Sequence, residues 1–89
     1  MTATGADLLL SEGWEPANVA TVVAALEALA PHVGHRAKIT KGASATTFGI
    51  VTVDPAAVIV RYKSGSNIYT ASGLGILRLF GGATITRGR

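Results

Sequence analysis

His32 and His35 are the residues whose spacing comes closest to a metal-binding pattern. Two imidazoles one helical turn apart can share a metal ion, but Pro31 and Gly34 disfavour a helix at this point. No acid or cysteine stands nearby in the sequence to complete a set of ligands. We therefore interpret both as solvated loop histidines, and we predict neither a metal site nor a cofactor.

Enzymatic chemistry finds little support among the remaining residues. Asp54 is the only acid after Gly34, and its place before Pro55 is typical of a turn, so a nucleophilic triad has no orienting carboxylate. The acids of the first 34 residues are an alternative pair for glycoside chemistry, but they are better explained as helix-end charges. The segment 73–75 begins like a dinucleotide fingerprint but lacks its third glycine. We predict no catalytic residues, no small-molecule substrate and no enzymatic activity.

The composition is typical of one small, apolar domain. With 89 residues there is room for a single domain, which we place at 1–89. Hydrophobic residues make up 48% of the chain and charged residues 15%, against a usual charged share of about a quarter. The apolar runs are too short for a membrane span, and the N-terminal stretch lacks the basic residues of a signal peptide. We expect a virion or cytoplasmic protein whose surface is partly covered by a partner.

The charges are divided between two segments of opposite sign. Residues 1–34 contain four acids and no lysine or arginine, so their formal charge is −4, whereas residues 35–89 contain eight basic residues and one acid, so theirs is +7. Such asymmetry favours a polyanion, a membrane surface or a copy of the same chain as partner. The residues predicted to form a basic face are Arg36, Lys38, Lys41, Arg61, Lys63, Arg78, Arg87 and Arg89.

Residues 1–34 are expected to form two helices. Thr4 and Asp7 have the spacing of a capping box, and Gly13 is well placed to end a short first helix. Pro16 is typical of the first turn of a second helix, which Pro31 ends. An apolar stripe of helical period runs along this second helix: Val19, Val22, Val23, Leu26 and Leu29.

The opposite face of the second helix carries small residues and a single charge, Glu27. A helix face in water normally carries charged residues, whereas a smooth, uncharged face lets another backbone approach closely. Alanine also favours helix on its own account, which is the alternative explanation. We interpret the face as a protein interface formed by Ala17, Thr21, Ala24, Ala25 and Ala28.

After Gly34 the pattern changes to the alternation of polar and apolar residues that is typical of strands. We expect strands over 36–40, 47–53, 58–63 and 68–71, and a closing or edge strand over 83–86. Turns are expected at 54–57 and 64–67. Residues 76–80 are apolar but too few to be assigned to helix or strand from their periodicity.

The β-rich part of the chain, residues 36–80, resembles SH3-like small barrels of the KOW or Tudor type. The resemblance rests on the basic first strand RAKITKG (36–42), on Gly49-Ile50-Val51 and on the third strand VIVRY (58–62). It implies a module that binds RNA, DNA or modified peptides. We therefore expect an α+β fold in which two helices (1–34) precede a small antiparallel sheet, or an SH3-like barrel, of four to five strands (35–89).

The first function predicted from these features is structural assembly. An uncharged helix face and oppositely charged segments suit head-to-tail contacts, which close into rings when the geometry permits. The partner would be a copy of the chain or a neighbouring structural subunit, with Arg61 and Lys63 facing Glu12 or Glu15 of the next copy. In its composition, which has few charges and no catalytic group, the chain resembles accessory virion proteins of tailed phages, such as connector or capsid-decorating subunits.

The alternative function is binding of DNA or RNA through the phosphate backbone. Arg36 and Lys38 share one strand face and Arg61 and Lys63 another, and neighbouring strands would join them into a stripe that tracks phosphates. Aromatic residues make up only 6% of the chain, which leaves little to stack on bases. Assembly is therefore the preferred hypothesis.

Overall fold

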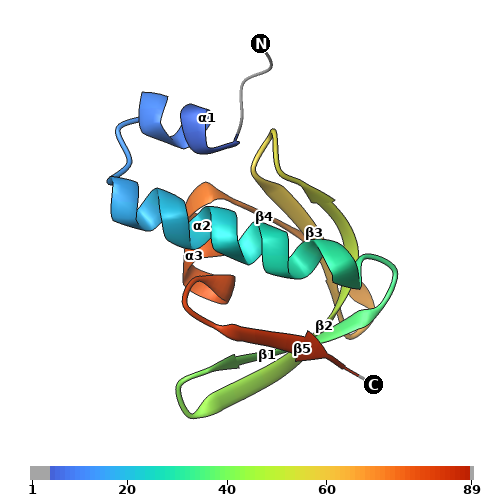
Figure 1. Cartoon of the computed structure of the whole chain (residues 1–89). Coiled ribbons are helices and arrows are strands. Elements are labelled where there is room, and N and C mark those ends of the chain that lie inside the picture. The colour runs from blue at the N-terminus through green and yellow to red at the C-terminus, as the bar shows by residue number, and fades with distance from the viewer. Residues whose placement is uncertain (1–4, 89) are drawn as a thin grey trace.

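Two helices joined at a tight corner begin the fold. The computed structural model describes residues 5–88, in which α1 (Gly5–Ser11) is followed by α2 (Pro16–Leu29) (Figure 1). Gly13 ends the first helical segment with a φ of 90°, as its sequence position predicts. Pro16 begins α2, and the short 3-10 turn Ala30–His32 follows its end. Thr4, the expected cap of α1, lies outside the described residues.

A five-stranded antiparallel sheet follows, and it confirms the predicted α+β class. The strands are β1 (Arg36–Lys41), β2 (Ser44–Asp54), β3 (Ile59–Ser64), β4 (Asn67–Ser72) and β5 (Thr84–Arg87). Their order across the sheet is β4-β3-β2-β1-β5. β4 and β5 form the two edges, so the sheet is not closed into a barrel. Of the two architectures expected, the open sheet is the one observed.

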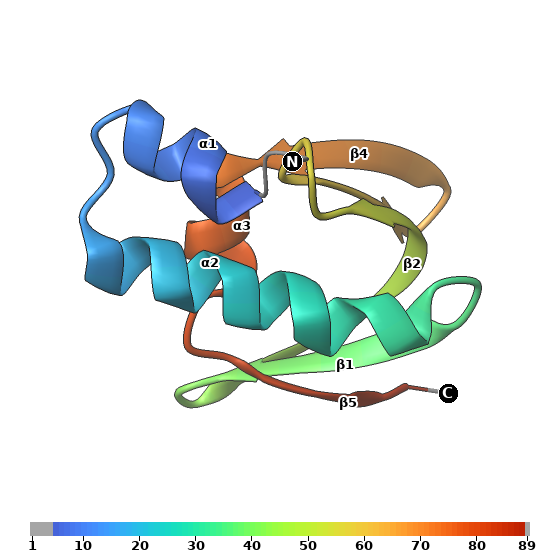
Figure 2. The ribbon, with the colours of Figure 1, turned by 45° about the horizontal axis from the view of Figure 1, so that its top comes forward.

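The sheet curls around part of the helical layer. The register of β2 against β3 shifts between Ile50 and Thr52, and such an irregularity bends a strand. Figure 2 shows β2 curving so that β4 lies on one side of α2 and α3, while β1 and β5 lie on the other. The curl gives the sheet an inner face, which contacts the helices, and an outer face, which is turned away from them.

α3 (Gly73–Phe80) includes residues 76–80, which periodicity could not assign, and begins three residues before them. It begins directly after β4 and packs against α2. Ile76 and Phe80 are fully buried in the core. The ring of Phe80 lies edge-on to Phe48 at 6.2 Å and to Tyr62 at 5.9 Å. The helical state of this segment therefore depends on tertiary packing.

One side of α2 fills the space inside the curl. Its buried residues include Val22, Ala25 and Leu29, which pack with Ala37, Ile39 and Val60 of the sheet. Ala25 is only 5% exposed, so the prediction that it belongs to the outward interface is wrong. The reason is helical geometry, since residue 25 lies on the same face as residues 22 and 29. Within residues 5–88, no helix has the length and hydrophobicity needed to cross a membrane.

Candidate functional site

Four basic residues share the outer face of the sheet. Successive side chains of a strand point to opposite faces. In β1, Ala37 and Ile39 are buried on the inner face, which places Arg36 and Lys38 on the outer face. In β3, Val60 is buried and Arg61 and Lys63 are exposed on the outer side by the same alternation. The outer face therefore carries four positive charges.

The two basic pairs do not come from neighbouring strands. β2 lies between β1 and β3, so the direct stripe expected from strand pairing is interrupted. In the register of the sheet, Gly49 of β2 stands opposite Arg36 on one side and opposite Lys63 on the other. A single row across three strands thus reads Arg36, Gly49, Lys63, and the middle position of that row has no side chain.

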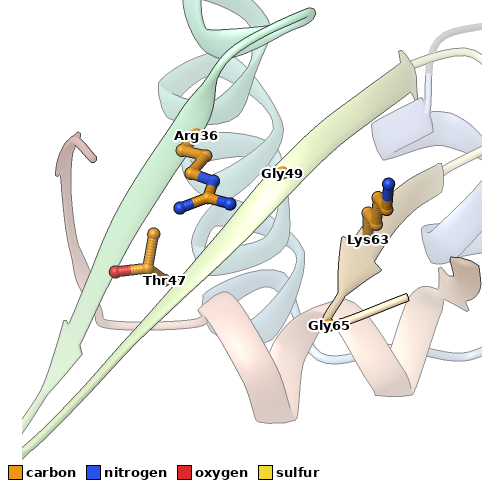
Figure 3. A pocket seen from close by; sticks show the side chains of 5 residues that line it. All are labelled: Arg36, Thr47, Gly49, Lys63 and Gly65. Atoms are coloured by element: carbon orange, nitrogen blue, oxygen red, sulfur yellow. The ribbon is translucent and has the colours of Figure 1, made fainter. Parts of the chain in front are cut away.

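A hollow of about 370 Å³ lies at this row. Figure 3 shows Arg36 and Lys63 on opposite sides of Gly49, with Thr47 and Gly65 completing the lining. We call it the Arg36–Lys63 hollow. A second hollow of about 370 Å³ adjoins it and shares Arg36, Gly49 and Lys63 with it. His35 lines this adjoining hollow.

The other predicted members of the basic face lie elsewhere. Lys41 lies at the end of β1, where its Nζ donates a hydrogen bond to the backbone carbonyl of Arg78 at 2.6 Å. Arg87 pairs with the buried Ala37 in the register of β5, which places it at the edge of the inner face. Arg89 lies outside the described residues. Arg78 is an exposed residue of α3. Four of the eight predicted basic residues therefore share the outer face of the sheet, and the other four do not join them there.

The exposed side of α2 is apolar and lies between two hollows. One hollow of about 390 Å³ separates α2 from α1, and another of about 390 Å³ separates it from α3 and β5. Ala24 lines both, so it forms the ridge between them. Of the expected interface residues, Ala17, Ala24 and Ala28 are exposed and Thr21 is half-buried, its hydroxyl donating to the carbonyl of Ala17 at 3.0 Å.

Sequence reasoning missed the contribution of α1 to this surface. Leu10, which is 47% exposed, lines the hollow between α1 and α2 together with Ala20 and Val23. The available signal was Leu8-Leu9-Leu10, because a short helix cannot bury three successive leucines on one side. Leu9 is buried, whereas Leu8 and Leu10 are exposed.

The acidic residues lie on the helical side of the molecule. Asp7, Glu12, Glu15 and Glu27 are all exposed and belong to α1, α2 or the corner between them. The helices cover the inner face of the sheet (Figure 2). The alternation of buried and exposed residues in β1 and β3 places the four strand cations on its outer face. The molecule therefore has a partly apolar side with four acids and one exposed arginine, Arg78 of α3, and a basic side opposite to it.

The histidines form no metal-binding group with their surroundings. Among residues 5–88, no three His, Asp or Glu side chains gather closely enough to hold a metal ion. Asp54 acts in the turn after β2, where its Oδ1 accepts a hydrogen bond from the backbone N–H of Ala57 at 3.2 Å. This contact confirms the predicted turn at 54–57.

Comparison with known proteins yields no relative, since no protein-family model, curated protein or solved structure matches the chain. The function is therefore inferred from the surfaces of the chain itself.

Proposed function

We propose that this protein is a non-enzymatic structural subunit that assembles with copies of itself, the helical side of one copy packing on the outer sheet face of the next. The observation that carries this proposal is the separation of charge. Four exposed acids lie on the helical side, and four basic residues lie on the opposite face of the sheet. Opposite potentials on opposite sides of one subunit favour head-to-tail contact.

The apolar surface of α2 supports the same arrangement. Ala24 forms a low ridge between two hollows, and the exposed Leu10 borders one of them. Small side chains allow another backbone to come close, and burial of this face, whose one charged residue is Glu27, would remove apolar surface from water. Acidic residues at the corner of α1 and α2 would then set the orientation of the neighbouring copy.

Head-to-tail contacts generate rings when the rotation between subunits closes. A ring or shell of such subunits is the setting implied by the resemblance to accessory virion proteins of tailed phages. In that setting, the subunit needs two complementary surfaces and no catalytic group. The resemblance of residues 36–80 to SH3-like barrels remains a proposal about the β-rich part of the subunit.

Binding of DNA or RNA through phosphates is the second candidate, favoured by the four cations on one face. Its weakness is the lack of a stacking surface. No aromatic residue of the described strands alternates onto the outer face, since Phe48, Tyr62 and Tyr69 are all in phase with inner-face residues. Base stacking usually contributes to single-strand binding, so phosphate contact alone would have to supply the affinity.

Light scattering of the full chain at low and high salt, with and without a mixed-sequence oligonucleotide, separates the two candidates. We expect a mass several times that of the monomer at low salt without nucleic acid. The mass should fall as salt screens the contacts between opposite charges. A monomer at every salt concentration that gains mass only with the oligonucleotide would reverse the order of the two functions.

A further inference from the structure

We propose that the Arg36–Lys63 hollow is an oxyanion site that binds a phosphate group. The inference goes beyond assembly, because it concerns the outer face of a single subunit, where one anion can bind before a neighbouring copy covers that face. Its basis is the row Arg36, Gly49, Lys63 across β1, β2 and β3. The hollow above this row, about 370 Å³, falls within the range of about 300–1,000 Å³ that is usual for ligand sites.

The charge of the hollow selects an anion. Two of its five lining residues are basic and none is acidic. Asp54, the one acid of the β-rich segment, is placed by register beyond the bulge, opposite Ile59, and its carboxylate bonds to the turn at Ala57. An anion in the hollow would therefore meet positive charge from two strands.

The missing side chain at Gly49 determines where the anion sits. Adjacent strands are about 4.8 Å apart, so the backbones of Arg36 and Lys63 are separated by about 10 Å across the row. Any larger residue at position 49 would project between the two cations. Because glycine stands there, the ligand can rest on the backbone of β2, within reach of a long side chain from either wall.

A tetrahedral phosphate suits this geometry better than a carboxylate. Phosphate oxygens point in several directions, so the guanidinium of Arg36 and the ammonium of Lys63 can bind different oxygens of one group from opposite sides. A carboxylate presents both oxygens in one direction and would favour one wall. The hydroxyl of Thr47, which also lines the hollow, supplies a further hydrogen-bond donor.

The adjoining hollow leaves room for an ester group on the phosphate. It continues from the same Arg36, Gly49 and Lys63 toward His35 and Val51. Two sources of the same chemistry therefore fit, free phosphate and a phosphodiester. They differ in whether the second hollow is occupied.

The test is a titration followed by NMR of the backbone amides of the full chain. Inorganic phosphate is added while chloride keeps the ionic strength constant. We expect saturable shifts confined to Thr47, Gly49, Gly65 and their neighbours. Lys63→Gln should weaken the phosphate affinity by about tenfold, since it removes one charge-assisted contact. Shifts that grow linearly without saturation, or that spread over the whole outer face, would overturn the proposal.

Two kinds of variant distinguish a site from general attraction. Lys38→Gln and Arg61→Gln remove the same charge from the same face, but neither residue lines the hollow. Each variant should bind phosphate with an affinity within about twofold of that of the unchanged protein. The reason is that its charge would act on the anion only from a distance, and salt screens such an interaction. If either variant lost as much phosphate affinity as Lys63→Gln, the anion would be attracted to the whole outer face and not bound at a specific site.

Gly49→Val fills the hollow without changing its charge and should abolish saturable binding. A Cβ at Gly49 would lie 3.6 Å from the Cβ of Lys63, an ordinary contact, so Gly49→Ala serves as the milder variant if valine disturbs folding. Unchanged affinity in the folded Gly49→Ala and Gly49→Val proteins would refute the proposed position of the anion.

A thymidine dinucleotide, which carries one phosphodiester, identifies the source of the phosphate. If it shifts His35 and Val51 in addition to the residues of the first hollow, the site takes an esterified phosphate. If inorganic phosphate binds and the dinucleotide does not, the site takes free phosphate. Failure of both ligands to bind overturns the proposal. It does not affect the assembly hypothesis, which is tested separately by the mass of the protein in light scattering.

Discussion

Gly73 lies against the indole ring of Trp14. An ideal Cβ on Gly73 would come within 3.2 Å of Trp14 Cζ2, and Gly73 has a φ of +32°. Trp14 belongs to the corner between α1 and α2, and Gly73 is the first residue of α3. The contact therefore fixes the N-terminal helices to the junction between β4 and α3, nearly sixty residues further along the chain.

Gly73→Ala should lower the free energy of unfolding by about 1–3 kcal/mol, because the methyl group crowds Trp14 and the backbone conformation is unfavourable for alanine. The matched control is Gly75→Ala in the same helix, where a Cβ would lie 3.5 Å from the Cβ of Ala71. That change should be neutral or stabilise the protein by about 0.5–1 kcal/mol. Urea denaturation measures both, and equal effects would contradict the role assigned to Trp14.

Ala24→Arg should leave the monomer folded while it reduces the mass of the assembly. Ala24 is exposed on the ridge of α2, so a long charged side chain would block the close approach of a neighbour. Asn18→Arg introduces the same side chain at an exposed position of α2 outside both hollows, and it should assemble normally. If Asn18→Arg and Ala24→Arg give the same mass, the ridge has no special role.

Ala25→Arg should behave differently from Ala24→Arg. Ala25 is buried in the core, so arginine there would place a charge without a partner inside the fold, a change that commonly exceeds about 3 kcal/mol. We expect loss of the folded circular dichroism and NMR spectra. A folded Ala25→Arg monomer would show that this side of α2 is less tightly packed than the structure indicates.

Reversing the charges on both sides of the subunit tests the head-to-tail contact. Lys38→Glu with Arg61→Glu, outside the Arg36–Lys63 hollow, should weaken assembly by about tenfold or more, and so should Glu12→Lys with Glu15→Lys. All four changes in one chain should assemble better than the sum of the two pairs predicts, because residues in contact are not independent. Additive losses in light scattering would place the acids and bases in different contacts.

Phe80→Leu should lower the free energy of unfolding by about 1–3 kcal/mol. The change removes edge-on contacts with Phe48 and Tyr62 while keeping an apolar side chain in the core. Tyr69→Leu removes one stacked contact with Tyr62, at 5.6 Å, from a residue that is 46% exposed. Its effect should be smaller, about 0.5–1.5 kcal/mol. Chemical denaturation ranks the two variants, and the reverse order would contradict the packing of α3.

The local elements of this fold could be predicted because their signals are local. Pro16 marks the start of α2, and the alternation of Arg36, Ala37, Lys38 and Ile39 marks β1 and also identifies its exposed face. Ala25 was misplaced because alanine has no strong preference for core or surface. Residues 76–80 of α3 could not be assigned because five residues give too few turns for a period, and the glycines at 73 and 75 hid the start of the helix.

The Arg36–Lys63 hollow could not be predicted from the sequence, for a different reason. Its residues come from three strands, and they meet only in one particular register. The irregularity of β2 between Ile50 and Thr52 changes which residues of β3 lie opposite β2, and no pattern in the sequence specifies it. The basic residues could be identified, but not the glycine between them.

The order of the strands also has a consequence for how the chain folds. β1, β2 and β3 each pair with the strand that follows in the chain, so their contacts form by closing short loops. β5 instead pairs with β1, joining Ala37 to Arg87 across 50 residues of chain. Closing so long a loop costs more entropy, so β5 should join the sheet late in folding. Until it does, the edge of β1 is open, and a nascent chain is most exposed to wrong strand pairing during that interval.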